Sequence, residues 1–392
     1  MSPPTIYIVD ALRAAGGRRK GRLAAWHPVD LAAAVLDALV QRNDIDPPLI
    51  DDVIMGCVSQ AGQQSSNVAR NAVLASRLLP ESVPGTTVDR QCGSSQQALQ
   101  FAAQAVASGM MDVVVAAGVE HMSRVPMGIA RTLPDANGLG NYRSPGLLAR
   151  YPDMFSQFTG AEMMARKYAL GRDTLDAYAL ESHRRAAAAT RSGHFEREIV
   201  PLAIDAANGN AELHRIDEGI RFDASAQALA AVKPIEDGGL LTAASSSQIC
   251  DGASAVLVAN DAGLKKMGAQ PLARLHASIV LGHDPVIMLE APIPATTRVL
   301  ARAGLTLQDI DLFEVNEAFA SVPLAWLQAL NADPSRLNVH GGAIALGHPL
   351  GASGTKLTAT LVSALHRHGK RWGLLTMCES GGMANASIFE RL

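Results

Sequence analysis

Two of the four cysteines stand where a thiol could act as a nucleophile or as a base. Cys92 lies just before a predicted helix, residues 93–106, and small residues follow it in the run 93–95. The N–H groups and dipole of a helix start favour an anion, which predicts a lowered pKa for the Cys92 thiol. Cys378 ends what we predict to be the last strand, residues 373–377. Cys57 and Cys250 have no such setting and are interpreted as small buried side chains.

Two further polar side chains fall at strand ends or adjoining turns, where ligands gather in α/β sheets. His348 lies in the glycine-rich run 340–354, which indicates a sharp backbone turn with room for a ligand. This segment corresponds to the Cys92 segment in the second half of an internal repeat, so by pseudo-symmetry we predict that His348 faces Cys92. A Cys–His pair of this kind can generate a nucleophilic thiolate. Asn316 ends the predicted strand 311–315.

The elements that must position these residues form an internal repeat. Strand, helix and strand segments at 52–55, 93–106 and 112–117 return in the same order at 311–315, 352–366 and 373–377. Matched landmarks are Asp52 and Asp311, Gly93 and Gly351, and Gly109 and Gly369, which lie 259, 258 and 260 residues apart. This nearly constant offset predicts a duplicated α/β unit.

The pattern divides the chain into two halves and an insertion. The N-terminal half is predicted at residues 1–120 plus 248–268, the inserted loop domain at 121–247, and the C-terminal half at 269–392. The insertion contains a predicted helical pair, 161–168 and 174–190, with Asp173 as a helix cap. We expect it to lie over one face of the first half and to help form a binding site.

Composition narrows the class of protein. A formal net charge of -3 gives no general attraction to nucleic acid or to anionic membranes. No CxxC pair is present, so neither a metal finger nor a disulfide framework is predicted. The apolar runs are too short to span a bilayer and no secretory signal is recognised, so the predicted location is cytoplasmic.

The four segments around Cys92, Asn316, His348 and Cys378 resemble, in order and spacing, the signature blocks of the thiolase family. The resemblance extends over essentially the whole chain. It implies an α/β fold with a five-layered αβαβα core of two similar halves and an inserted loop domain. It also implies acyl-CoA and coenzyme A as substrates, no metal, no bound cofactor, and a homodimer or homotetramer.

The resemblance also assigns roles. Cys92 would carry the acyl group as a thioester, His348 would activate it, and Cys378, with a depressed pKa, would move protons as the acid and base. Asn316 would hold a water in one oxyanion hole, and the backbone N–H groups of Cys92 and Ser380 would form a second. The family usually has Cys-x-Gly-Gly-Gly here, and Ser380 replaces the first of these glycines. Its side chain could crowd the acyl group.

The resemblance also implies residues that contact coenzyme A, and for two of them a second interpretation stays open. Ser247 matches the family's loop beside the pantetheine arm. Arg221 stands where the family often has an arginine near the adenine nucleotide, although a solvated surface arginine fits its position nearly as well. Phe319 could pack on pantetheine or belong to the core.

The acyl pocket is predicted to be larger than in short-chain members. Ser156 and Gln157 stand where acetoacetyl-CoA thiolases tend to carry histidine and methionine, and Phe155 and Phe158 flank them. This favours medium-chain, branched or cyclic 3-ketoacyl-CoA and a degradative enzyme. If the phenylalanines fill the space, a biosynthetic acetoacetyl-CoA-forming thiolase is the alternative.

Two other classes share the duplicated fold. Decarboxylating condensing enzymes normally pair one cysteine with two histidines. The presence of Cys378 and Asn316 argues against assigning this chain to that class. A non-catalytic lipid-binding relative should have lost one of Cys92, His348 and Cys378, and all three are present.

Overall fold

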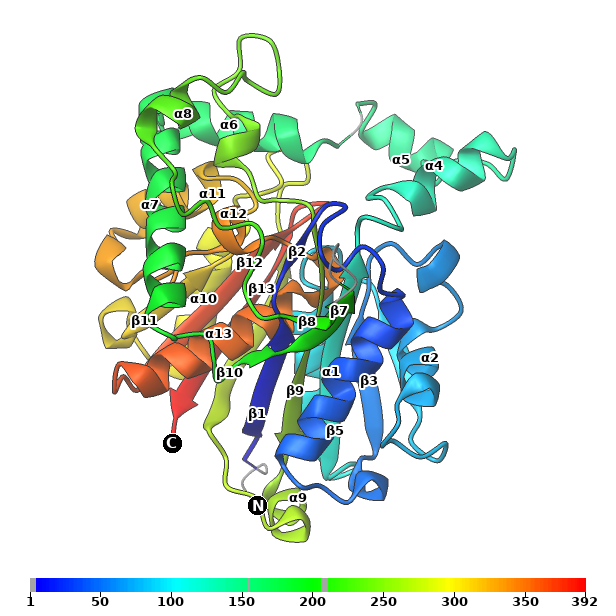
Figure 1. Cartoon of the computed structure of the whole chain (residues 1–392). Helices are drawn as coiled ribbons and strands as arrows, with labels where there is room; N and C mark the ends of the chain where they lie inside the picture. Colours follow the sequence, from blue (N-terminus) through cyan, green and yellow to red (C-terminus); the bar gives the residue numbers. More distant parts are fainter. Residues whose placement is uncertain (1–4, 154, 206–210) are drawn as a thin grey trace.

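A computed structural model describes residues 5–153, 155–205 and 211–392, so the first four residues of the predicted N-terminal half lie outside it. Its centre is an 11-stranded sheet with the order β11-β12-β13-β10-β1-β9-β5-β3-β4 (Figure 1). The strands on this path are β1 (Tyr7–Ala14), β3 (Asp52–Gly56), β4 (Gly85–Val88), β5 (Val113–His121), β9 (Cys250–Ala259), β10 (Ala273–Gly282), β11 (Leu312–Val315), β12 (Trp372–Glu379) and β13 (Met383–Arg391). The short strands β2 (Gly17–Arg18) and β6 (Ile199–Val200) pair with β9 and β1.

The strand order confirms the predicted duplication. In the first half β1, β9 and β5 are antiparallel neighbours and β3 runs parallel to β5. In the second half β10, β13 and β12 repeat the antiparallel series and β11 runs parallel to β12. The halves join where β1 pairs with β10, through Tyr7 with Arg274 and Ile8 with Ala273.

Successive residues of a strand pack against helices on opposite faces of the sheet, and this arrangement gives the five layers. Val113 and Val115 of β5 join the apolar cluster of α1 (Pro28–Arg42) and α2 (Val68–Ala75). Val114 and Ala116 point to the opposite face, as the two-residue period of a strand requires. There they join α3 (Ser94–Ser108) and α13 (Ser353–Arg367), which lie between the two half-sheets. Helices α10 (Pro292–Ala303) and α11 (Ser321–Leu330) cover the outer face of the second half.

The insertion packs differently from the prediction. Helices α6 (Gln157–Lys167) and α7 (Arg172–Arg191) bury apolar residues in the cluster of the second half, against α11 and α12 (Ala343–Leu346). The expectation that the insertion lies over the first half is therefore wrong for this pair, because their apolar stripes meet the second half's core.

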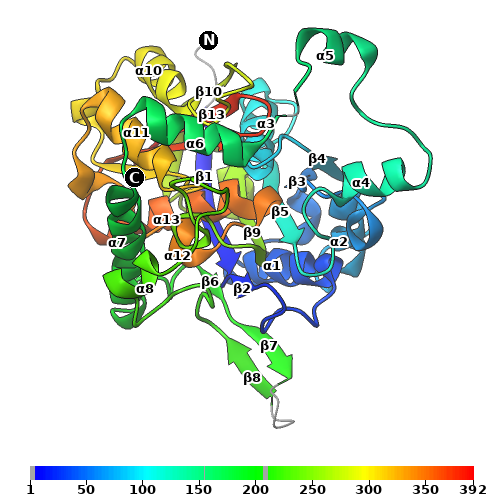
Figure 2. The ribbon, with the colours of Figure 1, turned by 90° about the horizontal axis from the view of Figure 1, so that it is seen from above.

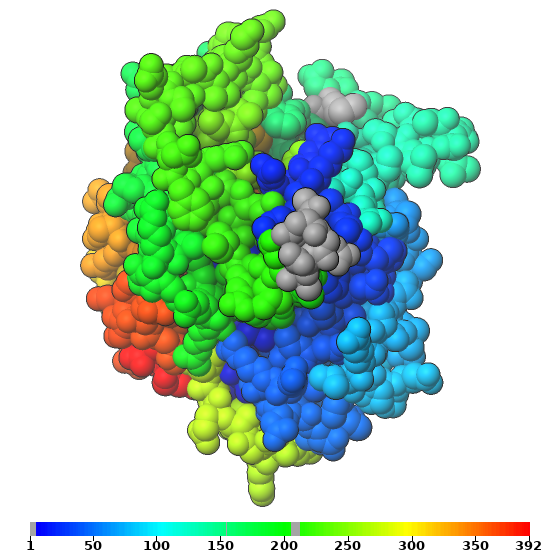
Figure 3. Space-filling model, in the orientation of Figure 1, coloured from blue at the N-terminus to red at the C-terminus, as the bar shows by residue number. Residues whose placement is uncertain are grey.

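Other parts of the insertion extend outward. Helices α4 (Ile129–Ala136) and α5 (Pro145–Arg150) project from the body, as does the hairpin of β7 (Leu202–Asp205) and β8 (Ala211–His214) (Figure 2). The insertion, with α8 (Ala226–Ala230), covers much of the upper part of the face seen in Figure 3.

Two expectations about the ends of elements are corrected. The N-cap of α1 is His27, whose Nδ1 accepts from the Val29 N–H at 3.3 Å, and α7 begins after Gly171 without the expected Asp173 cap. The strand that carries Cys378 is followed by β13, so it is not the last. α9 (Asp261–Met267) links the halves. Within the described ranges, no helix is long and apolar enough to cross a membrane.

Candidate active site

Cys92 lies in a tight turn between β4 and α3. Gln91 before it has φ +51°, a left-handed conformation that costs a non-glycine residue of order 1 kcal/mol. Ser94 closes the turn, because its hydroxyl accepts from the Arg90 N–H at 2.9 Å and donates to the Gln91 carbonyl at 2.6 Å. The N-cap of α3 is Gly93, with no side-chain cap. Cys92 therefore stands at the positive end of α3, as predicted.

The electrostatics of Cys92 nevertheless overturn the predicted pKa. Burial, and then the charge of Glu379, raise the pKa of the Cys92 thiol to about 12. A helix terminus contributes about 0.3–1 kcal/mol, less than one pKa unit, so it does not offset these effects. Cys92 is a neutral thiol at physiological pH and needs a base to become a nucleophile.

Glu379 is the unexpected group of the site. It is fully buried, and an added Cβ on Gly93 would lie 2.0 Å from its Oε1, so the carboxyl group lies against the backbone beside Cys92. Neither carboxyl oxygen makes a side-chain hydrogen bond of normal geometry within the described ranges. Burial raises the pKa of Glu379 to about 8, despite the opposing effect of Arg90. Sequence reasoning missed it, although it follows Cys378 directly.

Replacing Glu379 with glutamine should lower the pKa of the Cys92 thiol. The carboxylate is the second-largest cause of the raised pKa, and the amide removes its charge while keeping its shape. Alkylation of Cys92 by iodoacetamide, followed by peptide mass analysis between pH 7 and 10, measures the change. The rate at pH 9 should rise several-fold, and the exposed control Glu81→Gln should leave it unchanged. An identical pH profile in Glu379→Gln would contradict this interpretation.

His348 is a neutral imidazole whose hydrogen bonds identify its tautomer. Its Nδ1 lies 2.6 Å from the Ser353 hydroxyl, which donates its own proton to the Pro349 carbonyl at 2.9 Å. Ser353 can then only accept from the ring, so Nδ1 carries the proton and Nε2 the lone pair. Burial, and then the charge of Lys356, lower the pKa of His348 to about 3. The Asn316 Nδ2 lies 3.4 Å from Nε2.

Cys378 and Asn316 are both buried at the ends of their strands. Burial, then the neighbouring Cys92 and Glu379, raise the pKa of Cys378 well above its ordinary value, so the expected depressed pKa is wrong for this structure. Gly93 and Glu379, the chain neighbours of Cys92 and Cys378, lie against each other, so the two cysteines lie in the same part of the site. The Oδ1 of Asn316 has no hydrogen-bond partner within the described ranges.

Two buried carboxylates that sequence reasoning missed hold the turns of the site. Glu317 accepts from the Ile344 N–H at 3.0 Å and so fixes α12 before His348. Glu120 accepts from the Gly351 N–H at 2.9 Å and fixes the turn after it. Glu317 also accepts from the side chains of Tyr178, Ser182 and Asn338. Glu120 also accepts from the N–H groups of Val58 and Ser59 and from the side chain of Gln64. In the sequence, each of these two glutamates comes at the end of an apolar strand segment, and this pattern could have identified them.

A cavity of about 450 Å³ opens beside His348. Its lining includes four of the predicted substrate contacts, namely Phe158, Arg221, Ser247 and Phe319. Met122 and Leu350 also line it and belong to the same apolar cluster as Cys92. Arg18 and Arg19 complete the basic part of the wall. Sequence reasoning missed both arginines, although the basic run 18–20 was visible.

The fifth predicted substrate contact, Ser156, lies outside the cavity wall. Ser156 is the N-cap of α6 and its hydroxyl accepts from the Thr159 N–H, so the neighbouring Gln157 lines the cavity instead. Phe158 packs edge-on against Phe319, with ring centroids 5.6 Å apart. Ser380 is half-buried in the turn after β12 and is absent from the cavity wall. No group of three or more His, Cys, Asp or Glu residues suited to a metal occurs in the described ranges.

Comparison with known proteins identifies the class. Residues 6–262 match the thiolase N-terminal domain and residues 269–391 match the thiolase C-terminal domain. The chain belongs to the thiolase family, which confirms the resemblance predicted from the four sequence segments.

Individual relatives match over nearly their full length. The chain is 50% identical to a steroid 3-ketoacyl-CoA thiolase of Mycobacterium tuberculosis, over 98% of this chain and 94% of that protein. It is 41% identical to a 3-ketoacyl-CoA thiolase of Cronobacter sakazakii, over 99% of each. Among solved structures, the acetyl-CoA acetyltransferase of Bacillus anthracis superposes with a TM-score of 0.90 at 34% identity, over 100% of this chain and 99% of that one. Human mitochondrial 3-ketoacyl-CoA thiolase gives 0.89 at 34% identity, over 99% of each.

Proposed function

We propose that this thiolase cleaves 3-ketoacyl-CoA thioesters with coenzyme A, as a degradative acyltransferase. The observation that carries the proposal is the neutral His348, whose unprotonated Nε2 lies beside Asn316 at the cavity, together with two neighbouring buried thiols. The relatives named 3-ketoacyl-CoA thiolase support the direction of cleavage.

The first half-reaction acylates Cys92. His348 Nε2 accepts the thiol proton as the Cys92 sulfur attacks the 3-keto carbon, because the raised pKa leaves no preformed thiolate. The bond between C2 and C3 then breaks, and C2 keeps the electron pair as the enolate of acetyl-CoA. Cys378 donates its thiol proton to C2. The products are acetyl-CoA and an acyl thioester on Cys92, with Cys378 left as a thiolate.

The second half-reaction releases the shortened acyl chain. The Cys378 thiolate removes the proton from the coenzyme A thiol, and the resulting sulfur anion attacks the thioester on Cys92. The bond to Cys92 breaks, its sulfur recovers the proton held by His348, and a shortened acyl-CoA leaves. Asn316, through a water on its free Oδ1, and the N–H groups of Cys92 and Ser380 stabilise the oxyanions. Loss of one such donor typically costs about 10²–10³-fold in rate.

Coenzyme A is held along the cavity. Ser247 and Phe319 contact the pantetheine arm, and Arg18, Arg19 and Arg221 face the nucleotide phosphates, because guanidinium groups bind phosphate in a fixed fork geometry. Coenzyme A is a substrate in this scheme, and no bound cofactor or metal is required. The division into residues 1–120 plus 248–268, 121–247 and 269–392, the homodimer or homotetramer and the cytoplasmic location stay predictions.

The acyl specificity is tested with a series of 3-ketoacyl-CoA thioesters. A medium-chain or ring-bearing substrate should have at least a tenfold higher kcat/KM for thiolysis than acetoacetyl-CoA. Each buried methylene contributes about 0.8 kcal/mol, or about fourfold in kcat/KM. The 50% identity to a steroid 3-ketoacyl-CoA thiolase supports a large acyl group.

A clear preference for acetoacetyl-CoA would contradict this specificity and favour the biosynthetic alternative. Phe158→Ala then identifies the cause. If the edge-packed Phe158 fills the acyl space, the alanine variant should gain medium-chain activity that the wild type lacks. A protein with no thiolysis of any 3-ketoacyl-CoA would contradict the proposed function itself and leave the lipid-binding alternative.

A further inference from the structure

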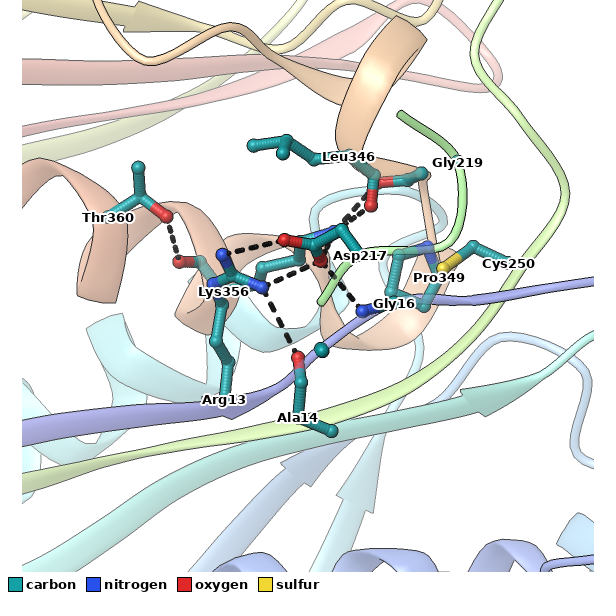
Figure 4. Close-up of polar contacts among 12 residues, drawn as sticks. Arg13, Ala14, Gly16, Asp217, Gly219, Cys250, Leu346, Pro349, Lys356 and Thr360 are labelled. Atoms are coloured by element: carbon teal, nitrogen blue, oxygen red, sulfur yellow. Dashed lines mark hydrogen bonds and ion pairs between the residues drawn. The ribbon is translucent and has the colours of Figure 1, made fainter. Parts of the chain in front are cut away.

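Four charged side chains, those of Arg13, Glu198, Asp217 and Lys356, are buried together beside the loop that carries His348. Figure 4 shows three of them, Arg13, Asp217 and Lys356, next to Leu346 and Pro349 of that loop. Arg13 of β1 pairs with Asp217 at 2.8 Å and with Glu198 at 2.6 Å. Lys356 in the first turn of α13 lies 4.0 Å from the Asp217 carboxylate. Burying a charge costs several kcal/mol unless it is paired and hydrogen-bonded. Each of the two cations here lies beside an anion, so the cluster compensates its own burial.

Lys356 uses its donors on the residues that lead into His348. Its Nζ donates to the Leu346 carbonyl at 2.6 Å and to the Gly347 carbonyl at 2.9 Å. These carbonyls end α12, where a helix leaves acceptors unsatisfied and a cation is favourable. Gly347 has φ +79°, and a Cβ there would meet the Cys250 sulfur at 2.6 Å. The loop is thus held by hydrogen bonds on one side and by close packing on the other.

The same helix turn also fixes the imidazole. Lys356 and Ser353 are three residues apart on α13 and so share one helix face. Ser353 accepts from the His348 Nδ1, while Lys356 holds the two preceding peptide groups. The His348 N–H donates to the Gln248 carbonyl at 3.0 Å. The ring of His348 and the two peptide groups before it are therefore anchored to a single turn of α13, while its own N–H is held by Gln248.

We propose that Lys356 is a positioning residue for the thiolase reaction, which directs His348 Nε2 toward the reacting thiol and is itself held by Asp217, the partner of Arg13. The inference rests on the proposed function of His348 as the base that activates Cys92. Asp217 belongs to the insertion, four residues before Arg221 of the cavity wall. The position of His348 is thereby coupled to the segment that lines the coenzyme A site.

The charge of Lys356 gives the proposal a readout that a purely structural role would not change. The side chains that hydrogen-bond to the imidazole, Ser353 and Asn316, are neutral, and Lys356 lowers the pKa of His348. The charged and titratable groups around Lys356 itself are Asp217, Arg13, Glu198 and Cys250. Removing the ammonium raises the pKa of His348. Since the base must be unprotonated, the acid limb of kcat/KM should then move to higher pH.

The experiment compares Lys356→Met with Lys356→Arg in the full-length protein. Methionine is close to lysine in length but has neither its charge nor its donors, whereas arginine keeps the positive charge and the N–H donors. Lys356→Met should lower kcat for thiolysis about 100-fold, the effect of a misplaced catalytic group. KM should change less than threefold, and the acid limb should rise by at least half a pH unit. Lys356→Arg should recover at least tenfold in kcat and the original limb.

Lys266→Met is the matched control, because Lys266 pairs with Asp112 on the surface and should change neither quantity. Circular dichroism and a melting curve establish that each variant is folded. If Lys356→Met does not fold, Lys356→Gln keeps two N–H donors without the charge and should show the same shift of the acid limb. A folded, uncharged variant with kcat within threefold of wild type, or with an unmoved acid limb, overturns the proposal. Absence of thiolysis in the wild type would instead overturn the proposed function.

Discussion

Replacing Cys92 with alanine should lower thiolysis by four to six orders of magnitude, the effect of removing a nucleophile from a coupled catalytic set. Cys92 stands at the start of α3 in a turn held by Ser94, and buried His348 offers the base that its neutral thiol requires. Incubation of the wild type with an acyl-CoA, followed by peptide mass analysis, should place the acyl group on Cys92. The loss of activity and the position of the acyl group are two independent tests of Cys92 as the nucleophile.

Cys57→Ala is the matched control for this experiment. Cys57 is also buried and burial raises the pKa of its thiol, but the proposed mechanism does not use it, so activity should remain within a few-fold of wild type. An acyl group found on Cys378, or on neither thiol, would overturn the assignment of the nucleophile.

Replacing Cys378 with alanine should separate acylation from turnover. The thiol of Cys378 moves the proton at C2 and at coenzyme A, and loss of a general acid and base costs about 10²–10⁴-fold. Acyl transfer from acyl-CoA to Cys92 needs neither of these protons, because His348 can return its proton to the departing coenzyme A thiolate. The variant should therefore accumulate acyl-Cys92 in the mass spectrum while thiolysis falls by that factor.

The measurement requires both readouts on one sample. Near wild-type thiolysis or condensation in Cys378→Ala would show that the two-cysteine mechanism is wrong for this protein. Loss of acyl uptake with retained fold would instead mean that Cys378 takes part in the first step as well. The Cys92→Ala variant provides the unlabelled reference.

The repeated strand–helix–strand order was readable from the sequence because it depends on local periodicity and glycine placement. The offsets between Asp52 and Asp311 and between Gly93 and Gly351 predicted two similar halves, and the strand order confirms them. The packing of the insertion was not readable. An apolar stripe on a helix does not identify its partner, and in the structure the stripes of α6 and α7 are buried in the core of the second half.

The site shows the same division between local pattern and assembled structure. The types and spacing of Cys92, Asn316, His348 and Cys378 were sufficient to predict the family, because that chemistry needs those groups in short, glycine-rich turns. The structure reversed the expected pKa of Cys92, because the effect depends on burial and on a carboxylate 287 positions away, at Glu379.

The sequence by itself therefore determined the duplicated fold, the reactive side chains and the family. Only the tertiary structure decided the pKa values of the reactive side chains and the residues that hold them in place. Ser156 became a helix cap instead of a pocket residue, and Lys356 was brought with Arg13 and Asp217 beneath the loop of His348. Hydrogen bonding and desolvation act over a few ångströms in space, whereas these partners are far apart in the chain.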